Sequence, residues 1–157
     1  MSALDPIRAA IVALAQSVPD VGIVHDRERY ASAPERLRAL YVPPGDTTIK
    51  GWYVRRVSTQ ETSGASGRWE IIHRWRLRGF RGFVDDAGSE KAFDAVIEAM
   101  RDAFRDDETL GNTVITTVVG DGDSAIAGLQ VDEAGSVMFA NALCHAATLT
   151  LYTRHYE

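Results

Sequence analysis

The strongest constraint on the fold lies in residues 69–80, where the sequence WEIIHRWRLRGF alternates between two kinds of side chain. In an extended strand, successive side chains point to opposite faces of the sheet. One face would carry Trp69, Ile71, His73, Trp75 and Leu77. The other face would carry Glu70, Ile72, Arg74, Arg76 and Arg78. A helix would mix these two sets, so the alternation predicts a β-strand with one face in the core.

A second extended segment precedes this strand. Residues 49–59 are rich in β-branched and aromatic side chains, and the segment TSGASG at 62–67 contains only small residues. Two strand-like runs joined by such a segment predict a long β-hairpin with a flexible tip. The chain therefore contains a sheet, and the other elements must pack on it.

Two amphipathic helices are predicted to flank this hairpin in the sequence. In the first, apolar residues recur at helical spacing from Leu4 to Val18, with Ser2 as the expected N-cap. The second is expected to begin with Ser89 as its N-cap and to end at residues 110–111. Its apolar face consists of Phe93, Val96, Ile97, Met100 and Phe104.

Shorter elements complete the predicted order. A small amphipathic piece is expected at 34–41, before the turn sequence PPGD at 43–46. The C-terminal third is expected to hold a strand at 114–119, a turn at 120–124, a short strand at 129–132, a turn at 132–136 and a long, bent strand at 137–154. The sequence thus predicts a single α+β domain over 1–157, of order α-β-β-α-β-β. Its sheet is expected to be mostly antiparallel, with two helices packed against it.

Composition narrows the cellular setting. The chain of 157 residues has a formal net charge of −5 and one cysteine, Cys144. No internal disulfide can form, which is typical of a reducing compartment. No apolar run approaches the roughly 20 residues of a membrane helix, and the N-terminus lacks the pattern of a signal peptide. We therefore expect a soluble protein without membrane contact.

The segment RGFRGFV at 78–84 is similar to the aromatic RNA-binding signature of RRM domains. The position that should hold the last aromatic residue is Asp85, and the segment runs into an acidic loop rather than a central strand. The net negative charge also disfavours phosphate binding. A nucleic-acid-binding module using the arginine strand with Trp69, Trp75, Phe80 and Phe83 stays an alternative interpretation.

No catalytic, metal or cofactor site is predicted. Cys144 and His145 are adjacent on an expected strand and would point to opposite faces, so they cannot form a nucleophile–base pair. The four histidines lack metal-binding spacing, and GDGDS at 120–124 lacks the remaining calcium ligands. The charged segment HDRERY at 25–30 is expected to be exposed and paired with itself. A small enzyme built around His25 and this segment is the third interpretation.

Two charged series stand out instead. Arg74, Arg76 and Arg78 share one face of the predicted strand, and residues 68–81 hold five arginines and one glutamate. Residues 85–108 hold nine acidic and three basic residues, among them the acidic series Glu90, Asp94, Glu98 and Asp102. Like charges four residues apart weaken an isolated helix. Either both surfaces are simply solvated, or these seven residues form a head-to-tail subunit interface between copies.

The ordered set of segments resembles the tail terminator and tail-to-head joining (neck) proteins of long-tailed bacteriophages. The similarity lies in the order of segments over nearly all 157 residues: an N-terminal helix is followed by VPDVGIVHDRERY, IKGWYVRRV, HRWRLRGFRGFVDD, GSEKAFDAVIEAMRDAF and ALCHAATLTLY. Each segment alone is unspecific, and the similarity lies in their order.

The resemblance implies an α-β-β-α-β-β domain whose copies form a hexameric ring. Such a ring caps the head-proximal end of the tail tube, joins it to the head–tail connector, and lets genomic DNA pass through its lumen without sequence readout. It implies a virion protein of the tail–neck junction that assembles in the bacterial host cytoplasm. No enzymatic activity or cofactor is implied, and another neck or head-completion protein is the alternative. The hairpin tip at 60–68 and the loop at 21–33 are candidate contacts to tube or neck.

Overall fold

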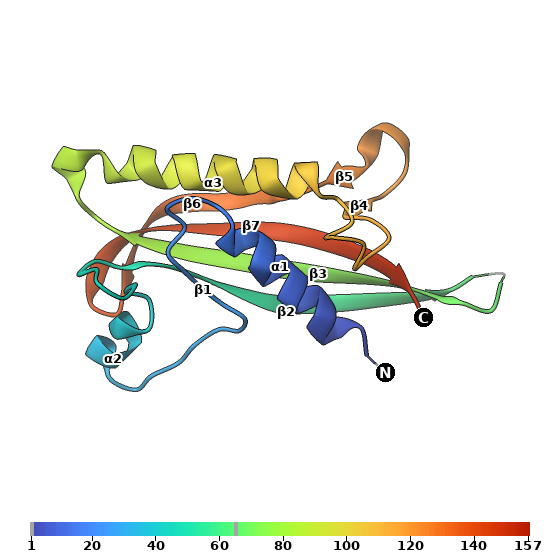
Figure 1. The fold of residues 1–157 in the computed structure, drawn as a ribbon, viewed down its shortest axis with the longest axis horizontal. Helices are drawn as coiled ribbons and strands as arrows, with labels where there is room; N and C mark the ends of the chain where they lie inside the picture. Colours follow the sequence, from blue (N-terminus) through green and yellow to red (C-terminus); the bar gives the residue numbers. More distant parts are fainter. Residues whose placement is uncertain (1, 65) are drawn as a thin grey trace.

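The computed structural model describes residues 2–64 and 66–157, so Ala65 in the expected hairpin tip lies outside the described residues. Figure 1 shows a sheet with helices packed along it. The helices are α1 (Leu4–Gln16), α2 (Pro34–Ala39) and α3 (Ser89–Asp106), with 3₁₀ turns η1 (Asp85–Ala87) and η2 (Gly122–Ser124). The strands are β1 (Ile23–His25), β2 (Lys50–Ser63), β3 (Trp69–Gly82), β4 (Val118–Val119), β5 (Ile126–Ala127), β6 (Gln130–Phe139) and β7 (Ala142–Tyr156).

Five strands form one sheet in the order β1-β2-β3-β7-β6, and β4 pairs with β5 in a small separate sheet. The four long strands are antiparallel neighbours, whereas β1 runs parallel to β2. The predicted α+β class with a mostly antiparallel sheet is therefore confirmed. The parallel β1 was not predicted, because three residues between loops give too short a pattern to recognise.

The alternation in β3 is confirmed. Ile71, His73, Trp75 and Leu77 are buried, while Arg74 on the opposite face is exposed. Trp69 departs from the pattern and is half exposed, since the β2–β3 hairpin projects beyond the helices at its outer end (Figure 1). The inward-facing side chains of β3 are therefore buried only where the helices cover the hairpin.

Helices α1 and α3 cover the same face of the sheet (Figure 1). The predicted apolar face of α3 is buried in full, together with Ile7 and Ile11 of α1. These side chains pack on Trp52, Trp75 and the inward residues of β7 to form the main core. Burial of such large apolar side chains is the dominant stabilising contribution in a domain of this size.

The opposite face of the sheet is only partly covered. Residues from α2 and the following segment, including Tyr41 and Ile49, pack on Phe80 and Cys144 at one end of the sheet and form a second apolar cluster. The stretch of β3 that carries Arg74 and Arg76 lies beyond this cluster. The fold therefore leaves part of this sheet face free of helices, and Arg74 and Arg76 lie there.

The C-terminal strands differ from the sequence prediction. The turn expected at 132–136 lies inside β6, which continues to Phe139, and the reversal occurs at Ala140–Asn141. Both turn residues have positive φ, 51° and 62°, as two-residue hairpin loops with the twist of the flanking strands require. Alanine gives no turn signal at such a position, which explains the wrong boundary. The Asp-Glu pair at 132–133 marks a bulge instead of a turn.

Three smaller predictions were also wrong. Within the expected strand 114–119, only Val118 and Val119 are strand residues, and Thr116 forms an isolated bridge with Arg154. Helix α3 begins at Ser89, and the N-cap position belongs to Gly88 at φ 69°. Ser2 accepts a hydrogen bond from the Leu4 N–H at 3.2 Å, but the N-cap of α1 is Ala3.

Among the described helices, none is long and apolar enough to cross a membrane.

Candidate functional site

The open face of the sheet concentrates positive charge. Arg76 on β3 lies directly opposite Arg55 on β2, and Arg74 and Arg78 follow on the same face of β3. Like charges directly opposite each other on antiparallel strands destabilise the pair. The Arg55–Arg76 pair therefore does not stabilise the sheet by itself.

A hollow of about 280 Å³ lies among these arginines. Arg74 and Arg76 line it together with polar side chains of β7, including Thr150 and Tyr152. Asp132 of β6 also lines the hollow, where its carboxylate accepts a hydrogen bond from Thr150. Between residues 2–64 and 66–157 there is no ion pair that includes Arg74 or Arg76. Their guanidinium groups are therefore available to a ligand.

The other two arginines of this face are already engaged. Arg78 donates a hydrogen bond to Thr148 at 2.6 Å, and its guanidinium lies 5.3 Å from the centre of the Phe80 ring. Arg55 forms an ion pair of 2.8 Å with Glu28, which belongs to the charged 25–30 segment. Of the three arginines predicted for an interface, Arg74 and Arg76 are thus better placed than Arg78 for an outside contact.

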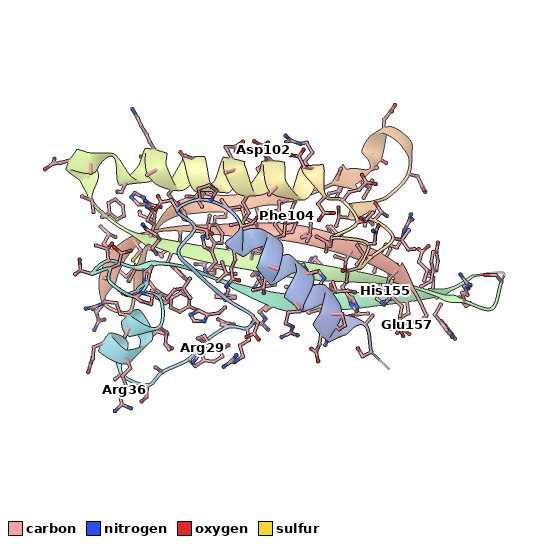
Figure 2. All side chains as sticks on the ribbon, viewed as in Figure 1. Arg29, Arg36, Asp102, Phe104, His155 and Glu157 are labelled. Carbon is pink, nitrogen blue, oxygen red and sulfur yellow. The ribbon has the colours of Figure 1, made fainter. Side chains whose placement is uncertain are left out.

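The acidic series lies on the outer surface of α3. Glu90, Asp94, Glu98 and Asp102 are all exposed, because the buried face of the helix points to the sheet. Figure 2 shows Asp102 directed away from the sheet and Phe104 directed toward it. The arginine series and the acidic series therefore lie on opposite sides of the molecule, and the structure does not bring them together within one chain.

The four acidic side chains are not equivalent. Glu98 is 2.7 Å from Arg101, and Asp102 is 2.8 Å from Arg105, both within α3. For Glu90 and Asp94, the described part of the chain offers no ion pair. Within the acidic series, the carboxylates of Glu98 and Asp102 are therefore paired, and those of Glu90 and Asp94 have no ion pair among the described residues.

Sequence reasoning missed the contact between Ser89 and His145. The Ser89 hydroxyl lies 2.8 Å from His145 Nε2 and accepts the Val84 N–H at 3.0 Å. Ser89 is 6% exposed and His145 is 7% exposed. The serine was read as a helix cap, a role it does not have, and only the packing of α3 on β7 brings the two residues together. The contact fixes the 83–88 loop and the histidine ring to each other.

The expected separation of Cys144 and His145 is confirmed. Cys144 belongs to the apolar cluster beneath α2, while His145 faces α3 on the other side of the sheet. Cys144 is fully buried, and this burial raises the pKa of its thiol. A raised thiol pKa lowers the thiolate fraction, so this cysteine is a poor nucleophile.

The 25–30 segment is paired with itself, as expected, and it also pairs with the sheet through Glu28 and Arg55. Arg27 contacts Asp26 at 2.7 Å, and the Tyr30 hydroxyl donates to Glu28 at 2.8 Å. His25 donates from Nε2 to the Leu40 carbonyl oxygen at 2.6 Å, which ties β1 to α2. That nitrogen is consequently not free to accept a proton from a substrate.

The aromatic residues of the nucleic-acid interpretation are divided by the fold. Trp75 and Phe80 are buried, on opposite faces of the sheet, while Trp69 and Phe83 remain partly exposed. Two of the four rings are therefore closed to base stacking. Across the described ranges, no three His, Cys, Asp or Glu side chains form a group suited to a metal ion.

His73 and His155 form a buried pair at the other end of the sheet. Their ring centres are 5.3 Å apart, and Figure 2 shows His155 beside Glu157 at the C-terminus. His73 Nδ1 lies 2.8 Å from the Thr59 hydroxyl. Burial, with smaller contributions from the nearby positive charges of His155 and Arg56, lowers the pKa of His73 to about 4.

This lowered pKa predicts acid sensitivity. The unfolded chain takes up a proton at its ordinary histidine pKa of about 6.5, so the free energy of unfolding falls as the pH drops from 6.5 toward 4. At pH 5, His73 alone is expected to remove about 2 kcal/mol of stability. Urea unfolding of the protein and of His73→Gln at pH 7 and pH 5 measures this contribution. An equal pH dependence in both proteins would exclude His73 as its source, because carboxylates titrate alike in the two.

Comparison of the sequence with protein-family models and with curated proteins finds no match. The assignment of a function therefore depends on the charged surfaces described above and on the ordered segments of the sequence.

Proposed function

We propose that this protein is a ring-forming virion protein of a long-tailed bacteriophage, acting as a tail terminator. Its copies would assemble head to tail into a ring, in a number that the sequence resemblance implies to be six. The ring caps the head-proximal end of the tail tube and joins it to the head–tail connector. Genomic DNA passes through the lumen without sequence readout, and the protein needs neither a cofactor nor catalytic residues.

One observation supports assembly above the others. Among the described residues, Arg74 and Arg76 on one side of the domain and Glu90 and Asp94 on the opposite side have no ion pair. Surfaces of opposite charge on opposite sides form a heterologous contact, in which each copy binds the next. Such contacts close into a ring when the rotation between neighbours allows it. The ordered segment resemblance supports the placement of this ring at the phage tail–neck junction.

The fold fits the proposed role in a second respect. The charged surfaces lie on rigid elements, the central strand β3 and the long helix α3, rather than on loops. An assembly interface gains affinity from groups that need no ordering on contact. The protein would be found in the virion, after assembly in the cytoplasm of the bacterial host, where it would be one of the neck or head-completion components.

The mass of the purified protein tests this proposal. Light scattering over a range of protein concentrations, with negative-stain images of the same samples, is expected to reveal closed rings of about six copies. A protein that remains monomeric at its highest soluble concentration, with no rings in the images, would contradict self-assembly through these surfaces.

Binding of single-stranded nucleic acid by the open sheet face is the second candidate. The observation that favours it is the cluster of Arg55, Arg74, Arg76 and Arg78 on the sheet face that α2 covers only at one end. A gel-shift titration with single-stranded RNA at two salt concentrations separates the two candidates. Strong binding that weakens steeply with salt would favour the nucleic-acid module. Absence of a shift together with rings would favour assembly.

A further inference from the structure

A second hollow lies at the N-terminal end of α3, on the side of the molecule opposite the arginines. It has a volume of about 370 Å³. Three aromatic rings line it, those of Phe83, Phe93 and His145, together with the carboxylates of Glu90 and Asp94. Ser136 and its neighbours in β6 close the remaining wall. Phe83 is 38% exposed, whereas Phe93 and His145 are buried, so the hollow combines one accessible aromatic face with two negative charges.

Packing within the fold holds the three aromatic rings of this hollow in place. The Phe83 ring stacks on His145 at 3.8 Å between centres with an angle of 25°, and the Phe93 ring lies 6.2 Å from His145 at 27°. The Ser89 hydroxyl accepts the Val84 N–H and lies 2.8 Å from His145 Nε2, within hydrogen-bond distance. Each phenylalanine ring is therefore tilted by 27° or less from the His145 ring, and these contacts hold the orientation of the histidine.

Of the acidic series Glu90, Asp94, Glu98 and Asp102, the two carboxylates at this hollow are those without an ion pair among the described residues. Glu98 and Asp102, further along the helix, have intrahelical arginine partners at 2.7 and 2.8 Å. Glu90 and Asp94 are exposed, and no ion pair engages them within the described residues. Negative charge and aromatic surface thus coincide at one end of the helix, which is the arrangement that attracts a cation with a flat face.

We propose that this hollow binds the guanidinium group of an arginine from a second copy of this chain. A guanidinium is planar, stacks on aromatic rings and donates paired hydrogen bonds to carboxylates, so it matches both features of the hollow. An ammonium group would satisfy the carboxylates but would not stack on the exposed Phe83 ring. The hollow also gives the proposed head-to-tail contact a defined register along α3.

The arginine comes from the open sheet face of the neighbouring copy. Arg74 and Arg76 line the hollow on that face and have no ion pair in the described chain, whereas Arg78 is held by Thr148 and Phe80. This inference rests on the proposed ring assembly and narrows it. Of the acidic series, Glu90 and Asp94 make the contact, and the paired Glu98 and Asp102 lie beside it.

Neutral, isosteric substitutions test the assignment. Glu90→Gln/Asp94→Asn is expected to raise the dissociation constant of the assembly at least about tenfold, since two charge-assisted contacts that become desolvated are lost. Glu98→Gln/Asp102→Asn removes the same amount of negative charge. This variant is expected to change the dissociation constant of the assembly by less than about fivefold. Asp121→Asn/Asp123→Asn, on the exposed η2 turn, is the control for net charge alone. Light scattering over a concentration series measures all three.

A filling substitution separates the hollow from long-range charge. Ser136 is exposed, lines the hollow and lies opposite His145 in the β6–β7 pair, so Ser136→Phe occupies the space without changing any charge. This variant is expected to weaken assembly by about tenfold or more while its circular dichroism spectrum stays that of the native protein. Its effect would not be reduced at high salt, unlike that of the charge variants.

The outcomes distinguish this inference from the ring proposal. Rings that form normally in Glu90→Gln/Asp94→Asn or in Ser136→Phe would overturn the arginine-binding hollow and leave ring assembly intact. Equal weakening by the two α3 double variants would also overturn it, because the contact would then follow overall charge. If the unsubstituted protein forms no rings, the proposed assembly is contradicted. The assignment of the hollow as its interface is then contradicted as well.

Discussion

Replacement of Gly79 by alanine is expected to destabilise the protein by roughly 3 kcal/mol, at the upper end of the range for overpacked cores. A Cβ atom at position 79 would lie well inside van der Waals contact with three ring atoms of Trp52. Trp52 is almost fully buried, and its ring stacks on Phe93 at 5.6 Å, so it cannot move aside without disturbing α3. Urea unfolding at neutral pH measures the loss directly.

Gly135→Ala is the matched control for this variant. Gly135 is also a strand glycine, in β6, but a Cβ atom there would meet no other atom within 4 Å. Its substitution is expected to leave stability unchanged or slightly improved, because alanine loses less backbone entropy than glycine on folding. If Gly79→Ala and Gly135→Ala unfold at the same urea concentration, Gly79 does not pack closely against the Trp52 ring and this prediction is wrong.

The second large effect is expected from reversing the charge of the open sheet face. Arg74→Glu/Arg76→Glu should convert rings to monomers, since both positions would then repel the acidic helix of the neighbouring copy. The fold should be retained, because neither arginine has an ion pair among the described residues and Arg76 stands opposite Arg55. Light scattering gives the mass, and circular dichroism checks the fold.

The Arg74→Glu/Arg76→Glu variant needs a control with the same change in net charge. Arg27→Glu/Arg36→Glu reverses two exposed arginines outside the open sheet face, in the 25–30 segment and on α2. Rings should persist in that variant. Native assembly should also weaken as salt is raised, to the extent that the ion pairs stay exposed. Unchanged rings in Arg74→Glu/Arg76→Glu would eliminate this interface, although another surface could still join the copies.

Local patterns decided much of the fold. The strict alternation in 71–77 placed β3 and its arginines correctly, because a strand has only two faces and one of them must be buried. The helical spacing of the apolar residues in α3 predicted its buried face, and hence the exposed acidic series, for the same geometric reason. In both elements the position of the charged residues follows from the apolar ones.

Other boundaries depended on partners that no local pattern reveals. The Asp-Glu and Gly-Ser residues at 132–136 favour a turn by composition. In the structure they belong to β6, which pairs with β7 along its length, so Asp132–Glu133 forms a bulge and Gly135 is a strand residue. The reversal occurs at Ala140–Asn141, where tight pairing of the two strands imposes positive φ on an alanine. Ser89 looked like a helix cap until the packing of α3 placed it against His145.

The sequence by itself determined the class of fold, the two charged series and the faces on which they lie, since periodicity and burial are local properties of a strand or helix. Only the tertiary structure decided that the two series lie on opposite sides of one domain. Only the tertiary structure also decided which charges remain unpaired and that Glu90 and Asp94 border an aromatic hollow. These depend on contacts between residues as far apart as Phe83, Ser136 and His145, and spacing along one element carries no information about such contacts.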